Sequence, residues 1–181
     1  MRKIITLVVI ALILASLCAC GSTTPTADTG TEKSEGTRTA ENAEVKNDKY
    51  SIGETWTVDG QWSLTINSVT PTDQRNDFAE STPAAVYIID YTFTNIGYKD
   101  AIGIMDGLFF GLDEGIVDAT GVMGYSYPGD VTKYPKETPV GATCNAQACV
   151  GVDNSGPFEI TVVQYDSNSN KQTATFSLIV E

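Results

Sequence analysis

Cysteines and carboxylates are the side chains best suited to chemistry in this 181-residue sequence, because it contains no histidine. The absence of imidazole excludes Ser-His-Asp triads, Cys-His pairs and histidine-based metal sites. A nucleophilic cysteine would also lack the base that normally activates it. We therefore predict no catalytic residue, no metal ligand and no cofactor, and we do not expect an enzyme.

Cys144 and Cys149 lie in a late segment in which small and apolar residues alternate with polar ones. Along a single strand five residues span about 16 Å, whereas a disulfide holds its Cα atoms about 4.4–6.8 Å apart. A bridge would therefore need Asn145–Ala148 to turn, although a close pair outside the cytoplasm favours a disulfide. Two interpretations stay open: a disulfide between Cys144 and Cys149, or two thiols with Cys144 buried and Cys149 facing outward.

A glycosidase would need two carboxylates at a defined separation beside a cleft. Acidic residues are plentiful, but turns also use Asp to accept backbone hydrogen bonds, and the sequence distinguishes no pair. The acidic residues considered are Asp106, Asp113, Glu114, Asp118, Asp130, Asp153 and Asp166. The segment from Asp166 starts like a calcium loop but has Lys171 in place of the required Gly and Ser177 in place of the required Glu, so we predict a hairpin turn there.

Residues 120–139 are rich in Gly, Pro and Tyr, and they form an unusually long connection. Tyr125, Tyr127 and Tyr134 are candidates for a contact surface, with Phe109 and Phe110 nearby, because Tyr supplies amphipathic area at a small loss of entropy. The alternative is that these tyrosines cover one end of the core. Since binding residues are often carried by loops on a rigid scaffold, we expect residues 70–84 and 120–139 to make the contacts.

The charge of the chain restricts its partners. The whole sequence has a net charge of −12, and residues 50–181 contain five basic against seventeen acidic side chains, again −12. Binding to nucleic acid requires Lys and Arg to neutralise phosphates, so we exclude nucleic acid as a partner.

The N-terminus has the pattern of a secretory signal peptide. Arg2 and Lys3 form a short positive region, and an apolar run over residues 4–15 follows. The run ends in Leu17-Cys18-Ala19-Cys20-Gly21, which resembles the bacterial lipobox. The resemblance implies that residues 1–19 are a cleaved lipoprotein signal peptide and that Cys20 carries the lipid, palmitate included.

Two alternatives to lipidation remain at this stage. A transmembrane helix needs about 20 apolar residues, and this run is shorter. Cleavage by the ordinary signal peptidase would leave an unexplained exposed thiol at Cys20. After the lipidated Cys20, residues 21–49 contain Val45 as their one large apolar residue, so residues 20–49 are predicted to be a flexible linker with a reach of roughly 30 Å.

From Tyr50 onward the apolar residues recur with a period of two, which predicts strands. A three-residue connection, Asp59-Gly60-Gln61, would pair Val58 with Trp62 and Trp56 with Leu64, placing the large apolar groups on one face. The remaining strands are expected at Ala84–Asn95, Leu108–Leu112, Ile116–Ala119, Ala142–Val152, Glu159–Tyr165 and Thr173–Val180, with Leu108–Leu112 and Ile116–Ala119 forming a hairpin. Seven or eight short strands with regular turns predict an all-β, antiparallel β-sandwich.

The sequence also resembles a known family in its structural positions. These positions are Gly53 before a strand, Trp62 in a strand that ends at Ser68-Val69, and a hydrophobic strand that ends at Thr94-Asn95. They resemble the immunoglobulin-like domains of uncharacterised bacterial surface lipoproteins, mostly Gram-positive, whose fold is also that of a secreted mycobacterial immunogen. The resemblance implies an immunoglobulin-like β-sandwich over residues 50–181 and a cell-surface setting, and it carries no catalytic residues.

These features together predict a non-enzymatic, lipid-anchored binding or interaction module on the extracytoplasmic face of a bacterial cell membrane. We expect a monomer whose partners are the membrane, through the lipid on Cys20, and an unidentified protein or peptide ligand. Two alternatives remain open: an envelope enzyme that acts on glycans with carboxylates, and a structural accessory lipoprotein of a transporter.

Overall fold

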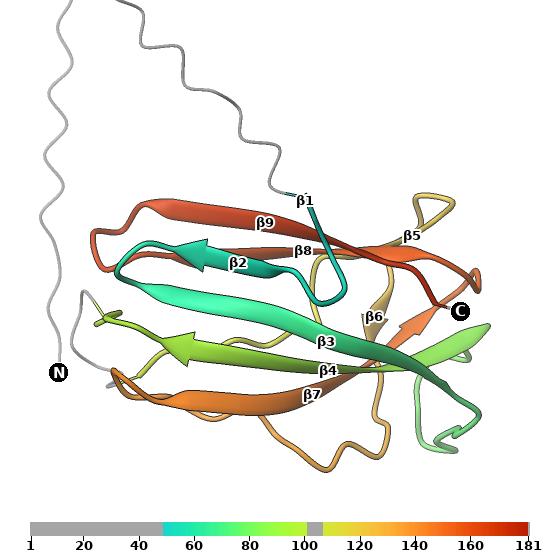
Figure 1. Cartoon of the computed structure of the whole chain (residues 1–181). Coiled ribbons are helices and arrows are strands. Elements are labelled where there is room, and N and C mark those ends of the chain that lie inside the picture. Colours follow the sequence, from blue (N-terminus) through green and yellow to red (C-terminus); the bar gives the residue numbers. More distant parts are fainter. Residues whose placement is uncertain (1–48, 101–106, 181) are drawn as a thin grey trace, which may run out of the picture. The chain divides into compact units, whose positions relative to one another are not determined.

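The computed structural model describes residues 49–100 and 107–180, and these form an all-β sandwich of two sheets (Figure 1). The predicted signal peptide, the predicted lipid site Cys20 and the predicted linker up to residue 48 lie outside the described residues. The described strands are β1 (Lys49–Ser51), β2 (Thr55–Val58), β3 (Trp62–Thr72), β4 (Ala85–Asn95), β5 (Ile116–Asp118), β6 (Tyr125–Ser126), β7 (Thr143–Val152), β8 (Phe158–Tyr165) and β9 (Lys171–Leu178).

One sheet has the strand order β1-β9-β8-β5 and the other β2-β3-β4-β7-β6. All the strand pairs are antiparallel except β1 with β9, which run parallel. The all-β sandwich predicted from the sequence is therefore confirmed. Strand β1 begins at Lys49, whose ammonium pairs with the carboxylate of Glu159 at 2.5 Å.

The β2–β3 hairpin has the predicted register. Trp56 lies opposite Leu64 and Val58 opposite Trp62, around a turn in which Gly60 has a positive φ of 68°. Only this register keeps the large apolar groups on one face, because a shift of one residue would turn each side chain to the other face.

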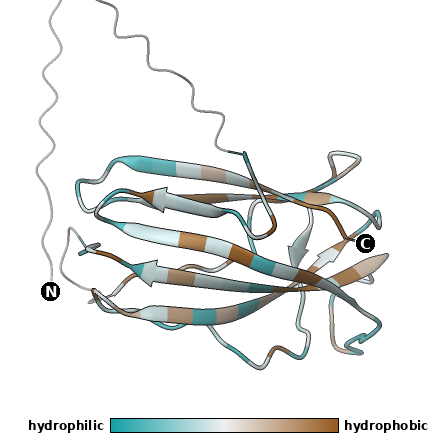
Figure 2. Cartoon of the chain, in the orientation of Figure 1, coloured by the Kyte–Doolittle hydropathy of each residue, from teal (hydrophilic) through white to brown (hydrophobic). Residues whose placement is uncertain are grey.

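The core lies between the two sheets, and the alternation of side chains along each strand supplies it. Figure 2 shows apolar residues recurring between hydrophilic ones along β3, β4 and β7. The large side chains with an exposed fraction below 2% include Trp62, Leu64, Ile66, Ile89, Tyr91, Phe93, Ile116, Phe158, Ile160 and Phe176. Trp62 packs edge-to-face on Trp56, Tyr98 and Phe110, an arrangement that aromatic rings favour.

The predicted hairpin between Leu108–Leu112 and Ile116–Ala119 is wrong. Strand β5 instead pairs with β8, placing Ile116 opposite Ile160, and the backbone of Leu108 exchanges two hydrogen bonds of 2.9 Å with Thr138. The two segments separate because each finds a different partner that is distant in sequence. Leu108, Phe110 and Leu112 are still buried, so this segment closes one side of the sandwich without belonging to a strand.

The β8–β9 hairpin is confirmed, and Asp166 forms its turn. Its carboxylate accepts hydrogen bonds from the backbone N–H groups of Asn168 and Asn170 and from the side chains of Asn170 and Gln172. These bonds hold the pKa of Asp166 below its ordinary value, since they stabilise the charged form.

Candidate functional site

Residues 127–139, which we call the strap, follow β6 and run beside the outer edge of β7. Tyr127 N–H donates to the carbonyl of Cys149 at 2.9 Å, and the N–H of Gln147 donates to the carbonyl of Lys133 at 2.7 Å. Pro128, Pro135 and Pro139 interrupt the segment. Proline has no N–H to give to a ladder, so the strap contacts β7 at intervals and does not continue β6 as a full strand.

A second apolar cluster lies under the start of the strap, on the outer side of the five-stranded sheet. Val86, Tyr127 and Cys149 form its buried centre, with exposed fractions of 1%, 5% and 6%. The Tyr127 hydroxyl oxygen accepts a hydrogen bond from the N–H of Asn76 at 2.8 Å, and the Asn76 side chain donates to the carbonyl of Pro128. The two loops expected to make contacts therefore meet each other here.

Gly129 is required at its position in the strap. A Cβ atom at Gly129 would lie 2.4 Å from Sγ of Cys149, far inside van der Waals contact. Burial raises the pKa of the Cys149 thiol, partly offset by a hydrogen bond from the Gly129 backbone, and the charge of Asp130 raises it further. The thiol is thus protonated at neutral pH, which is the unreactive form of cysteine.

A polar network fixes the middle of the strap to the outer face of the sheet. The ammonium of Lys133 lies 2.8 Å from the carboxylate of Asp90, which also accepts hydrogen bonds from Asn67 and Gln147. Burial raises the pKa of Asp90, but these three donors outweigh it and leave the pKa below its ordinary value. The carboxylate of Asp90 is thus charged and fully engaged in holding the strap.

A groove of about 590 Å³ separates the strap from the segment Phe109–Asp113. Its apolar lining includes Phe109, Leu112, Tyr127, Val131, Tyr134 and Pro135, and Cys149 and the edge of β7 contribute to its wall. Phe109 and Tyr134 are 42% and 64% exposed, so their rings are available to a ligand. A hollow of this size with aromatic walls and a few polar groups has the character of a binding site.

Two carboxylates, Asp113 and Asp130, line this groove from opposite segments. Both are exposed, and no Lys or Arg is among the described residues that line the groove. Burial is the main reason why the pKa of the Tyr91 hydroxyl is raised far above its ordinary value, and the charge of Asp113 adds to this. The lining of the groove itself therefore contains acidic but no basic side chains.

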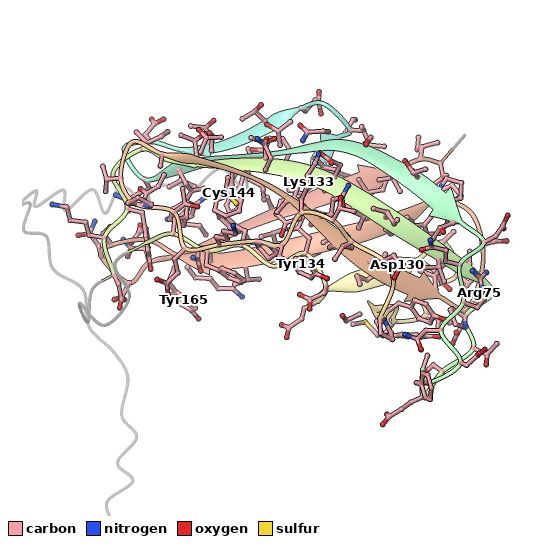
Figure 3. The ribbon with its side chains drawn as sticks, turned by 90° about the horizontal axis from the view of Figure 1, so that it is seen from below. Arg75, Asp130, Lys133, Tyr134, Cys144 and Tyr165 are labelled. Atoms are coloured by element: carbon pink, nitrogen blue, oxygen red, sulfur yellow. The ribbon has the colours of Figure 1, made fainter. Side chains whose placement is uncertain are left out.

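Two smaller hollows adjoin the groove along the strap. One, of about 480 Å³, lies between residues 132–139 and residues 142–145, and it shares Tyr134 with the groove. The other, of about 300 Å³, lies beside residues 74–78 and shares Tyr127 and Asp130 with it. Figure 3 shows Lys133, Tyr134 and Asp130 between Cys144 on one side and Arg75 on the other, which is the direction of this row of hollows.

No protein-family model matches this chain, and no match was found among curated proteins. Among solved structures it is similar to ycdA, a candidate lipoprotein of Bacillus subtilis, at 13% identity and a TM-score of 0.44 over 70% of this chain. It is also similar to the yjhA protein of Bacillus subtilis, at 16% identity and a TM-score of 0.43 over 71% of this chain and 98% of that one. The chain spans 38% of the length of ycdA, and similarities of this size assign it no function.

The structure separates the three tyrosines predicted to form a contact surface. Tyr134 is exposed at the groove, whereas Tyr127 is buried and anchors the strap. Tyr125 lies in β6 and its hydroxyl points toward Asp153, at 3.4 Å from the carboxylate. Tyr134 therefore remains a predicted contact residue, whereas Tyr127 covers the second apolar cluster.

The two cysteines lie on opposite faces of the continuous strand β7, and both are free thiols. Cys144 is half-buried against the main core, and Cys149 is buried in the second cluster. The sequence predicted that Cys149 faces outward if the thiols are free, and Cys149 does face away from the main core. It is nevertheless buried, because the strap covers it. The sequence pattern of β7 alone could not show this cover.

The described acidic residues include one buried carboxylate, Asp118, which is 5% exposed. It accepts hydrogen bonds from the Asn154 side chain, from the hydroxyl and N–H of Thr120, and from the N–H of Val122. These bonds, that of Asn154 foremost, hold its pKa far below the ordinary range. Asp118 therefore closes a turn, and within residues 49–100 and 107–180 no group of three or more Cys, Asp or Glu is placed to hold a metal ion.

Within the same residues, no helix is long and apolar enough to cross a bilayer.

Sequence reasoning missed the groove because it assigned residues 108–112 to a hairpin. Two features of the sequence could have indicated the groove. Phe109 is a large apolar residue that falls between the alternating apolar positions 108, 110 and 112, and the acidic Asp113 follows them directly.

Proposed function

We propose that this protein is a lipid-anchored, extracytoplasmic binding module that presents the groove beside the strap to a ligand. The observation that carries the binding proposal is the groove itself, in which the exposed rings of Phe109 and Tyr134 face a hollow of about 590 Å³. The anchoring proposal rests on the lipobox-like sequence that ends at Cys20. An immunoglobulin-like surface lipoprotein of a bacterial envelope would combine these features.

The absence of enzymatic activity is part of the proposal. It is supported by the buried, protonated thiol of Cys149 and by the pKa shifts of four carboxyl groups. The surroundings lower the pKa of Asp90, Asp118, Glu159 and Asp166, which is opposite to what a general acid at neutral pH requires.

Membrane partition of the full chain tests the anchor. In the native bacterium, the wild-type protein should fractionate with membranes and incorporate labelled palmitate, whereas Cys20→Ser should do neither. Cys18→Ser is the matched control, and it should behave as the wild type. Membrane association and labelling of Cys20→Ser would refute the lipidation site.

Capture from the native envelope tests the binding site. The full-length protein should recover a specific ligand after gentle crosslinking, and a Phe109→Ala, Tyr134→Ala double variant should lose it. Val163→Ala, Tyr165→Ala is the control, because both side chains are about half exposed on β8, at 45% and 54%. Equal recovery by both double variants would show that the groove is not the binding site.

A carboxylate-based glycan hydrolase is the second candidate function, and it is favoured by the presence of Asp113 and Asp130 in one groove. Release of reducing ends from purified envelope glycans, abolished by Asp113→Asn or Asp130→Asn, would establish it. We expect no such release.

A further inference from the structure

We infer that the groove beside the strap binds an extended peptide through a lysine or arginine side chain, an inference that rests on the proposed binding function. The cationic group would lie between Asp113 and Asp130, and its aliphatic stem would pack on Tyr134 and Phe109. The strap and the segment Phe109–Asp113 supply one carboxylate and one exposed ring each.

The charges around the groove select a cation. Asp113 and Asp130 belong to opposite walls, and no basic side chain is among the described residues that line the groove. Lys133, the basic residue nearest in sequence to Tyr134, is directed to the outer face of the sheet by its 2.8 Å ion pair with Asp90. An incoming cation therefore meets two carboxylates in the groove itself, whereas Arg75 lines the hollow beyond Asp130, and Lys133 and Lys136 line the hollow beyond Tyr134.

The aromatic rings strengthen this preference. A cation over the face of an aromatic ring is attracted by the ring quadrupole, by about 0.5–1 kcal/mol at exposed sites. Long basic side chains also bury their methylene stems on apolar surfaces while the charged head stays in contact with water. Leu112, Val131 and Pro135 provide such a surface within the groove.

The row of hollows favours a peptide over a small amine. The groove shares Tyr134 with one neighbouring hollow, and Tyr127 and Asp130 with another, so a ligand can continue along the strap in both directions. A single ammonium compound would occupy only the central part. An extended chain with a basic residue at its centre would fill the row.

Fluorescence polarisation with defined peptide pools tests this inference on the full-length protein in detergent. The pools are short fluorescent peptides with Lys, Arg, Gln or Glu fixed at the centre and random residues elsewhere. The Lys and Arg pools should bind about fivefold more tightly than the Gln pool at low salt, with the Glu pool weakest. This difference should shrink as salt is raised, because the carboxylates are exposed.

Variants distinguish the contribution of the groove's carboxylates to peptide binding from that of its aromatic rings. Asp113→Asn, Asp130→Asn should remove the preference for Lys and Arg and leave the binding of the Gln pool unchanged. Asp153→Asn, Asp166→Asn carries the same change in net charge away from the groove and should keep the preference. Phe109→Ala, Tyr134→Ala should weaken the binding of every pool.

Each outcome decides one claim. Equal binding of the Lys and Gln pools, or binding of no pool, would refute the cation inference, while loss of envelope capture in Phe109→Ala, Tyr134→Ala would still uphold the proposed function. Binding of free n-butylamine or agmatine as tight as that of the Lys pool would refute the peptide as the source of the cation. Loss of the preference in the Asp153→Asn, Asp166→Asn control would assign it to overall charge and refute the site.

Discussion

The two faces of the five-stranded sheet bury their apolar side chains in different ways. The inner face packs on the second sheet, and Trp62, Ile89 and Phe93 are fully buried there. The outer face is polar across Asp90 and Thr92, and among the described residues its buried apolar groups, Val86 and Cys149, lie where the strap covers it.

The difference indicates that the strap and the core are separate energetic units. The inner face gains its burial from two whole sheets, whereas the outer cluster depends on one segment held by a few hydrogen bonds. Segments with few buried contacts open locally at a lower free energy than the core strands. We therefore expect the strap, which borders the groove, to open at a lower free energy than the core strands.

The largest expected effect lies on the inner face. Ile89→Ala should lower the free energy of unfolding by about 2–5 kcal/mol, because it leaves a cavity between the sheets. Urea denaturation followed by tryptophan fluorescence measures this, since Trp56 and Trp62 are in the same core. Val163→Ala, on the exposed side of β8, is the control and should stay within about 0.5 kcal/mol. A loss as small as that of the control would contradict the assignment of Ile89 to the core.

The next effect lies in the contact between strap and sheet. Gly129→Ala should destabilise the protein by about 1–2 kcal/mol, since its Cβ would overlap Sγ of Cys149, 2.4 Å away. In a Cys149→Ala background the same change should cost less, because the remaining Cβ of residue 149 would lie 3.3 Å away. An additive double-mutant cycle would show that the two residues do not meet.

A smaller effect is expected from the bond between the two loops. Tyr127→Phe keeps the ring but removes the oxygen that accepts the Asn76 N–H, and it should lower the free energy of unfolding by about 0.5–1.5 kcal/mol. Hydrogen exchange of the Asn76 amide should also become faster. The matched change Tyr134→Phe, at an exposed ring, should have no measurable effect on stability. Equal stabilities for the two variants would place the Tyr127 hydroxyl in solvent.

The smallest effect concerns the ion pair at the centre of the strap. Lys133→Met should destabilise by about 0.2–1 kcal/mol at neutral pH, as is usual for a pair near the surface. The folded-state pKa of Asp90 is lowered, so the contribution of this carboxylate is present above its unfolded pKa of about 3.9 and is lost as the pH falls through the folded value.

Denaturation at pH 7 and in acid checks this prediction, with Lys136→Met as the control. The difference between wild type and Lys133→Met should shrink below about pH 4. A difference that grows in acid would show that Asp90 is not the partner that matters.

Much of the fold could be predicted because its information is local. The alternation along β3, β4, β7 and β9 fixed which residues face the core, and the Trp56–Leu64 register followed from the need to keep apolar groups on one side. The Asp166 turn followed from the tendency of an Asp side chain in a turn to accept hydrogen bonds from nearby backbone N–H groups.

The site could be predicted only in part. The sequence offered Tyr134 as a candidate contact residue with Phe109 nearby, and it placed Asp113 and Asp130 among the acids, but it could not bring them to one groove. That placement depends on Leu108 pairing with Thr138 and on β5 pairing with β8. Such pairings join residues far apart in the chain, and no periodic pattern encodes the partner.

The sequence by itself thus determined an acidic composition without histidine and an all-β domain, and it predicted a lipoprotein signal peptide from the lipobox-like residues before Cys20. Only the tertiary structure decided that Cys149 is buried, that Tyr127 anchors and Tyr134 is exposed, and that two carboxylates share a groove. The physical reason is that side-chain alternation is a property of each strand by itself. The covering of Cys149 by the strap, and the groove that Asp113 and Asp130 both line, arise only when segments distant in the sequence pack together.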